Sequence, residues 1–321
     1  MALGVRPVVP SRLTTRLFGH GPRTEFGSKS QSRHAPNRLS AYVALTKPRI
    51  IELLLVTTIP TMVLAKKGWP SFSLMVVTLI GGTLAAGGAN AINMYIDRDI
   101  DRLMTRTQGR PLVTGVITPK AALTFAIALE ICAFAVLAFG ANILAACLAL
   151  SATLFYVFVY SLWLKRTSKH NIVIGGAAGA VPVLVGWAAV TNSLSWTPLV
   201  LFLVIFFWTP PHFWALAIRH TDEYRAAGVP MLPVVASLDQ TIRSMVTYCV
   251  VLVITTIALI PIAGMGWIYG VSAVVLGAAF TLRALRLGRD PSEQRAMRLF
   301  SFSITYVSVL FLALTVDVLL R

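Results

Sequence analysis

The sequence predicts an all-α integral membrane protein, a bundle of about nine transmembrane helices forming one domain. Composition gives the first two reasons: 56% of the 321 residues are hydrophobic and only 12% are charged, and the mean hydropathy is +0.76. Such values are typical of membrane proteins and not of soluble cores. The third reason is that apolar stretches long enough to cross a bilayer recur along the chain.

The expected transmembrane helices follow these apolar stretches in chain order. We divide the long apolar region between residues 121 and 164 near Gly140-Ala-Asn142, which gives a third and a fourth span. The first span is the shortest. The expected spans are 50–65, 73–96, 121–139, 142–164, 172–190, 197–218, 243–263, 266–282 and 299–319.

The positions of the basic residues predict how the bundle is oriented. If the N-terminus is cytoplasmic, all but three of the 28 Lys and Arg fall on the cytoplasmic side, the exceptions being Lys66, Lys67 and Arg321. This distribution follows the positive-inside rule and accounts for the net charge of +16. No base-reading motif accompanies the charge, so we do not expect nucleic-acid binding.

Residues 1–46 are expected to form a basic, disordered cytoplasmic tail. This segment is rich in Arg and Ser, and Glu25 is its only acidic residue. Such a tail fits attraction to anionic lipids at a bacterial plasma (inner) membrane. The same composition also resembles a mitochondrial presequence, so the mitochondrial inner membrane is the alternative location.

Asn93, Asp97 and Asp101 recur every four residues after the second span. On a helix this spacing places the three side chains on one face, whereas Asp99 points elsewhere. Oxygen ligands of this kind suit Mg²⁺ that carries a phosphate ligand. The alternative interpretation is a solvated helix end with Asp–Arg ion pairs.

A second acidic loop follows the sixth span and is expected on the same side of the membrane as the first. It carries Asp222 and Glu223, so one site could form between the two loops. Basic residues that could grip the oxygens of a diphosphate lie on this side as well. They are Arg102, Arg106, Arg110, Lys165 and Arg166.

Several ordered motifs, dense between residues 41 and 235, give the chain a family resemblance. They are Leu45-Thr-Lys-Pro-Arg49, Asn93-Met-Tyr-Ile-Asp97-Arg-Asp-Ile-Asp101, Arg110-Pro-Leu112, Tyr160-Ser-Leu-Trp-Leu-Lys-Arg-Thr167, Asn171-Ile-Val-Ile-Gly-Gly-Ala-Ala-Gly-Ala-Val-Pro182, Pro211-His-Phe-Trp-Ala-Leu-Ala-Ile218 and Asp222-Glu-Tyr-Arg-Ala-Ala-Gly-Val-Pro-Met-Leu-Pro233. With these motifs the chain resembles the UbiA superfamily of intramembrane prenyltransferases. Within it, the chain is most similar to the protohaem IX farnesyltransferases, also called haem O synthases.

The resemblance implies a helical bundle around a central cavity, with residues 47–321 as the prenyltransferase domain. It implies transfer of a farnesyl group from farnesyl diphosphate to a vinyl group of haem B, with water addition, giving haem O and diphosphate. Proteins of haem A synthesis or of haem-copper oxidase assembly would then be partners beside the lipid bilayer.

The resemblance also implies roles for individual residues. Asn93, Asp97 and Asp101 would form the first Mg²⁺ site, and Asp222 would be the main ligand of a second site to which Glu223 also contributes. Asp97, Asp101 and Asp222 would be the catalytic residues. The residues that bind substrate would be Asn93, Arg102, Arg106, Arg110, Lys165, Arg166, His212 and Glu223.

His212 allows three interpretations, because it follows Pro210-Pro211 inside an apolar span. It could ligate haem iron, it could bond a carbonyl freed by the prolines, or it could support the second acidic site. Glu130, alone in the third span, has no role that the sequence assigns. Two other functions stay open: prenylation of a quinone ring precursor, and a non-catalytic transporter or assembly factor.

Overall fold

The computed structural model describes residues 37–321, except for the side chains of residues 49–55. Residues 1–36 of the tail expected at 1–46 therefore lie outside the described residues. The rest of that segment is helix α1 (Arg38–Thr46), which packs against helix α3. Asn37 caps α1, since its side chain accepts a hydrogen bond from the backbone N–H of Leu39 at 3.3 Å.

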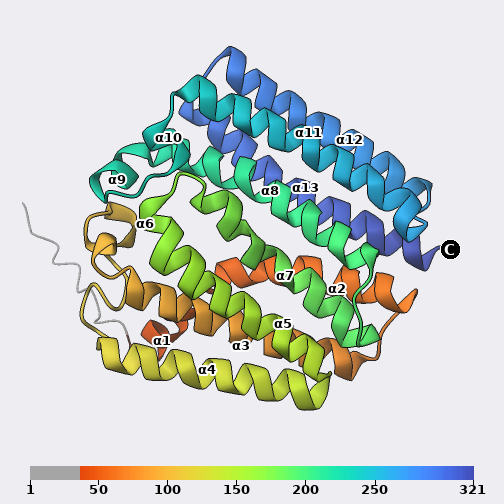
Figure 1. The fold of residues 1–321 in the computed structure, drawn as a ribbon, viewed down its shortest axis with the longest axis horizontal. Coiled ribbons are helices and arrows are strands. Elements are labelled where there is room, and N and C mark those ends of the chain that lie inside the picture. Colours follow the sequence, from red (N-terminus) through yellow and green to blue (C-terminus); the bar gives the residue numbers. More distant parts are fainter. Residues whose placement is uncertain (1–36) are drawn as a thin grey trace, which may run out of the picture. The chain divides into compact units, whose positions relative to one another are not determined.

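Nearly all of the described chain is helical, in agreement with the predicted fold class (Figure 1). Among the described residues, eight helices or helical segments are long and apolar enough to cross a membrane. The remaining expected span, at 50–65, lies in α2 (Pro48–Lys66). The eight are α3 (Phe72–Ile96), α4 (Pro119–Gly140), α5 (Ile143–Leu154) with its continuation to Thr167, α7 (Asn171–Thr191), α8 (Trp196–Arg219), α11 (Leu238–Ala263), α12 (Trp267–Arg289) and α13 (Glu293–Leu319).

The middle of the bundle is formed by α2, α7, α8 and α13. Within this group, α2 and α8 each pack against both α7 and α13. Helices α3, α4 and α5 lie on one side of this group, and α11 and α12 lie on the other (Figure 1). The interface of α3, α4, α5 and α7 is built largely from buried alanines, including Ala85, Ala133 and Ala146. Small side chains allow membrane helices to approach closely, which accounts for this packing.

The ends of several helices differ from the ends of the apolar stretches. Helix α13 begins at Glu293, six residues before the predicted span, and α12 continues to Arg289. Ser292 caps α13, and Ser237 forms a capping box with Gln240 at the start of α11. Hydropathy indicates where lipid surrounds a helix, whereas capping determines where the helix ends.

One segment has a local structure that the sequence does not indicate. Helix α5 continues as a π-helix, η3 (Phe155–Leu164), and then as the short α6 (Lys165–Thr167). Tyr160 of η3 lies against Gly175 of α7, where an added Cβ would overlap the tyrosine ring. The π-helical segment therefore sets the direction in which the chain presents Tyr160 and the following Lys165.

Two loops that are distant in sequence lie at the same end of the bundle (Figure 1). The first follows α3 and contains the short 3₁₀ helices η1 (Ile100–Arg102) and η2 (Thr105–Thr107). The second follows α8 and contains α9 (Thr221–Ala226) and α10 (Leu232–Val235). The fold thus brings together the two acidic loops.

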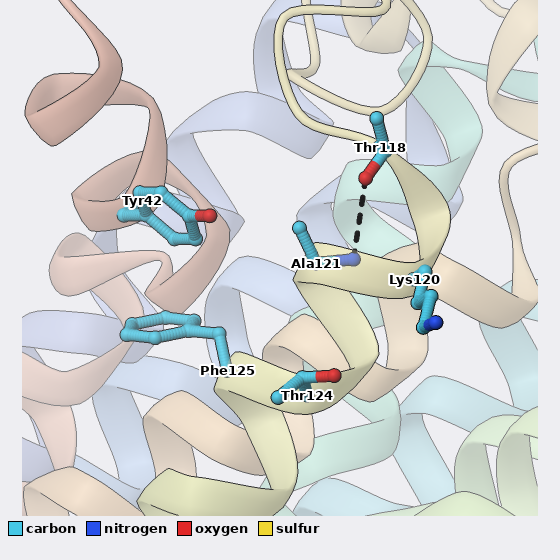
Figure 2. Close-up of a pocket in the computed structure, with 6 residues that line it drawn as sticks. All are labelled: Tyr42, Thr118, Lys120, Ala121, Thr124 and Phe125. Atoms are coloured by element: carbon cyan, nitrogen blue, oxygen red, sulfur yellow. Dashed lines mark hydrogen bonds between the residues drawn. The ribbon is translucent and has the colours of Figure 1, made fainter.

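A shallow groove lies between α1 and the first turns of α4 (Figure 2). Thr118 caps α4 there, and its Oγ1 accepts a hydrogen bond from the backbone N–H of Ala121 at 3.3 Å. The groove contains none of the predicted site residues. Its lining residues are Tyr42, Thr118, Lys120, Ala121, Thr124 and Phe125.

Candidate active site

Asn93, Asp97 and Asp101 lie at the point where α3 ends. Asp97 directly follows the last residue of α3, and Asp101 lies in η1. The backbone keeps the four-residue hydrogen-bond spacing of an α-helix here. Asp97 N–H donates to Asn93 O and Asp101 N–H donates to Asp97 O, each at 2.9 Å. The side chains of Asp97 and Asp101 are 0% and 1% exposed, so both carboxylates are buried.

Each buried carboxylate has a basic partner. Lys165 forms an ion pair with Asp97 Oδ2, and Arg110 Nη1 lies 2.6 Å from Asp101 Oδ2. Arg166 Nη2 lies 3.9 Å from Asp97 Oδ1. Three of the predicted diphosphate-binding residues therefore surround the cluster. Charged groups can be buried here because each has a compensating neighbour.

Asp99 faces away from this cluster, as the spacing predicts. Its side chain is 60% exposed and forms two hydrogen bonds with Arg166, at 2.6 and 2.7 Å. These hydrogen bonds lower the pKa of Asp99 to about 2.

Both buried carboxylates retain one oxygen that has no hydrogen-bond partner. These atoms are Asp97 Oδ1 and Asp101 Oδ1. Buried acceptors without a partner are rare and costly, so they indicate a missing ligand. Two carboxylates also suit Mg²⁺, which proteins usually hold through one or two carboxylates together with substrate phosphates. Within residues 37–321, no three His, Cys, Asp or Glu side chains converge on a metal position.

Asn93 organises the cluster through its amide. Its Nδ2 donates to Asp97 Oδ2 at 2.7 Å and to Ser161 Oγ at 3.1 Å, and its Oδ1 accepts from Lys47 Nζ at 2.9 Å. Ser161 belongs to the π-helix η3 and is fully buried. In this structure Asn93 therefore orients Asp97, and the amide oxygen that the sequence assigns to the metal accepts the hydrogen bond from Lys47 instead.

Lys47 also contacts the cluster, although its motif, Leu45-Thr-Lys-Pro-Arg49, does not indicate a role for it. It connects α1 to α2 with φ +53°, a left-handed conformation that costs roughly 1–3 kcal/mol in a residue other than glycine. Burial, followed by the charges of Arg110 and Lys165, lowers the pKa of Lys47 to about 7. The one indication in the sequence is that Lys47 directly precedes Pro48, just before the first expected span.

The second acidic loop reaches the first through Glu223 and Tyr224, and not through Asp222. Glu223 Oε2 accepts the backbone N–H of Arg106 at 3.4 Å, and Arg106 Nη2 donates to Tyr224 Oη at 3.0 Å. Asp222 is 95% exposed and pairs with Arg225 at 2.5 Å. Adjacent positions on a helix point about 100° apart, so α9 directs only one of the two acids toward the other loop.

The structure separates Asp222 and Arg102 from the buried cluster. The side chain of Arg102 is exposed and has no ion pair with a described residue. Arg106 serves to join the two loops instead of pairing with Asp97 or Asp101. Glu130 accepts a hydrogen bond from Thr153 Oγ1 at 3.2 Å and lies against Gly88 of α3, so it links three helices.

His212 lies between α8 and α13. Its ring stacks on Trp208 at 4.2 Å and on Phe300 at 4.6 Å between ring centres. Its Nδ1 lies 2.6 Å from Ser303 Oγ on α13. Nδ1 therefore bonds neither a carbonyl freed by the prolines nor the second acidic loop. The histidine beside that loop is His220, whose Nδ1 lies 3.1 Å from Glu223 Oε1.

Comparison with known proteins gives matches along most of the chain. The profile of the UbiA prenyltransferase family matches residues 54–313. A protoheme IX farnesyltransferase of Streptomyces coelicolor is 50% identical over 308 residues, which is 94% of this chain and 98% of that protein.

Solved structures give the same fold at lower identity. A digeranylgeranylglyceryl phosphate synthase structure has a TM-score of 0.74 at 19% identity and covers 88% of this chain and 99% of that one. A UbiA homologue of Archaeoglobus fulgidus, solved with DMAPP and Mg²⁺, has a TM-score of 0.58 at 18% identity, covering 86% and 99%. With this fold, the family match and a relative half identical over nearly its whole length, the chain belongs to the UbiA prenyltransferase family.

Proposed function

We propose that this chain transfers a farnesyl group from farnesyl diphosphate to a vinyl group of protohaem IX (haem B). The observation that carries this proposal is the 50% identity to a protoheme IX farnesyltransferase over 98% of that protein. The site supports it, because the basic residues and the buried carboxylates match the charges of a prenyl diphosphate and its counter-ion. The products are haem O and diphosphate.

Lys47, Arg110, Lys165 and Arg166 bind the diphosphate. All four contact the Asn93, Asp97 and Asp101 cluster, and three of them form ion pairs with its carboxylates. Asp97 and Asp101 would hold Mg²⁺ through their carboxylates, each of which keeps one oxygen without a hydrogen-bond partner in this structure. When bound, Mg²⁺ supplies positive charge that neutralises the leaving diphosphate.

Two tyrosines of η3 lie close to these residues. Tyr156 stacks on Tyr160 with 5.3 Å between ring centres, and Lys165 Nζ lies 6.0 Å from the centre of the Tyr160 ring. Their π-faces stabilise the allylic cation that forms as the carbon–oxygen bond to diphosphate breaks. The Tyr160 ring packs against Gly175 of α7, and this packing excludes water from the cation until the acceptor reacts.

The chemistry on the acceptor needs no protein nucleophile. The terminal vinyl carbon of haem B forms a bond to C1 of the farnesyl cation, which leaves a cation on the neighbouring carbon. A water molecule adds to that carbon and loses a proton, giving the hydroxyethylfarnesyl group. His212 binds the haem.

A reconstitution assay tests the proposal. Purified protein is incubated with haem B, farnesyl diphosphate and Mg²⁺, and the products are separated by mass. We expect haem O with Mg²⁺ and a strong loss of product in EDTA. A parallel reaction replaces haem B with an aromatic quinone precursor. Prenylation of that precursor but not of haem would refute the acceptor, and turnover in EDTA would refute the metal.

We also propose a bacterial plasma membrane location with both acidic loops in the cytoplasm, where proteins that use haem O can receive the product. The supporting observations are the distribution of Lys and Arg and the bacterial source of the relative. Reporter fusions near Gly115 and Gly228 should report the cytoplasmic side, and a fusion after Arg321 the opposite side. Opposite reports from Gly115 and Gly228 would contradict a shared site.

A further inference from the structure

Ser303 of α13 binds two aromatic side chains of α8. Its backbone carbonyl accepts a hydrogen bond from Trp208 Nε1 at 2.8 Å. Its hydroxyl lies 2.6 Å from His212 Nδ1. Ser303 is fully buried, so water does not compete for these bonds. One residue therefore fixes the position of α8 relative to α13 and the orientation of the His212 ring.

The hydrogen bonds of Ser303 determine which nitrogen of His212 carries the proton. Ser303 Oγ lies 2.5 Å from the carbonyl oxygen of Phe300. A carbonyl oxygen cannot donate, and two oxygens this close repel unless a proton lies between them. The single proton of the Ser303 hydroxyl therefore points to the Phe300 carbonyl. Ser303 Oγ must then accept a hydrogen bond from His212 Nδ1. The neutral ring is thus the Nδ1–H tautomer, and Nε2 carries the lone pair.

The neighbours of the His212 ring leave the Nε2 edge as its reactive side. Trp208 and Phe300 cover the two faces, and Phe213 approaches edge to face at 5.1 Å. Ser303 occupies Nδ1. Nε2 has no hydrogen bond to a described residue. Nε2 is therefore the ring nitrogen of His212 that stays available to a ligand.

We propose that Ser303 is a positioning residue that holds His212 as the Nδ1–H tautomer, with Nε2 directed to the iron of the haem acceptor. This inference rests on the proposed function, which supplies the haem. Neutral imidazole is a common iron ligand, and a hydrogen bond from its second nitrogen fixes the ring and increases its basicity. The chain Phe300 O, Ser303 Oγ and His212 Nδ1 provides that bond.

Two measurements test the inference on the full-length protein. The first is ¹⁵N NMR of histidine-labelled protein without substrate, with the His212 signals assigned by comparison with His212→Gln. We expect a protonated Nδ1 and an unprotonated Nε2. The second is an optical titration with haem B of the wild type, of Ser303→Ala and of the control Ser301→Ala, which changes an exposed serine of the same helix.

We expect Ser303→Ala to bind haem about 10- to 100-fold more weakly and with an altered spectrum, as loss of such supporting hydrogen bonds commonly does. Ser301→Ala should bind haem as the wild type does. Farnesyl diphosphate affinity should not change in either variant, which would show that Ser303→Ala is folded. Ser303→Thr keeps a hydroxyl and should show the spectrum of the wild type.

The outcomes separate this inference from the proposed function. A wild type with a protonated Nε2, or Ser303→Ala with unchanged haem affinity and spectrum, would overturn the role of Ser303 while leaving farnesyl transfer intact. A wild type that binds no haem would overturn the proposed acceptor, and the iron ligand with it.

Discussion

Replacing Asp97 with Asn tests the role of the buried cluster most directly. The substitution keeps the shape of the side chain and removes the charge that faces Lys165. Removing one partner of a buried ion pair costs about 3–5 kcal/mol. We expect the same free energy to be lost from stabilisation of the transition state in which the diphosphate leaves. This loss corresponds to a decrease in kcat/KM of about 10²- to 10⁴-fold. The assay is haem O formation by purified protein.

Asp99→Asn is the matched control, because Asp99 lies two residues away and its pair with Arg166 is exposed. An exposed pair contributes about 0–1 kcal/mol, so kcat/KM should fall by about fivefold at most. Size-exclusion profiles and thermal unfolding in detergent establish that both variants are folded. If the folded Asp97 variant stayed within fivefold of the wild type, or if Asp99→Asn lost as much activity, our assignment of the cluster would be wrong.

Three further predictions follow from contacts in the site. Glu223→Gln should lower kcat/KM more than Asp222→Asn, because only Glu223 contacts the first loop; the reverse order would favour the sequence-based role of Asp222. With a pKa of about 7, Lys47 is charged below that pH and neutral above it. Farnesyl diphosphate affinity should therefore fall above pH 7 in the wild type but not in Lys47→Arg, and equal pH profiles of the two proteins would refute this. Gly175→Ala should lower activity by displacing the π-helix, whereas Gly179→Ala, which meets open space, should not; equal activities of the two variants would contradict the packing argument.

The fold could be predicted from sequence because lipid imposes a simple requirement on each spanning segment. Hydropathy located the spans, including the division at Gly140, where α4 ends and Asn142 caps α5. The π-helix at 155–164 could not be predicted. Most of its residues are apolar and would suit an α-helix equally well, and the shift in hydrogen bonding depends on contacts such as Tyr160 against Gly175.

The candidate site was predictable only where the spacing fixes a geometry. A four-residue repeat places Asp97 and Asp101 on one face whatever the surroundings. By contrast, Asp222 and Glu223 are adjacent acids, and the direction of α9 decides which one faces the first loop. Lys47 could be taken for an ordinary positive-inside anchor, because its contact with Asn93 depends on how α1 and α2 pack near α3.

The charges of the buried cluster predict that Mg²⁺ and farnesyl diphosphate bind cooperatively. In this structure Lys165 and Arg110 neutralise Asp97 and Asp101, so these basic residues can turn to a diphosphate only when another cation compensates the carboxylates. Linkage requires that each ligand raise the affinity of the other by the same factor, and typical coupling of 1–3 kcal/mol gives about 5- to 150-fold. Calorimetric titration with a non-hydrolysable farnesyl diphosphate analogue, with and without Mg²⁺, measures that factor. In Asp101→Asn, which keeps one of the two carboxylates, the factor should decrease. If the wild type binds the analogue equally well in EDTA, the carboxylates and the diphosphate do not share their cations.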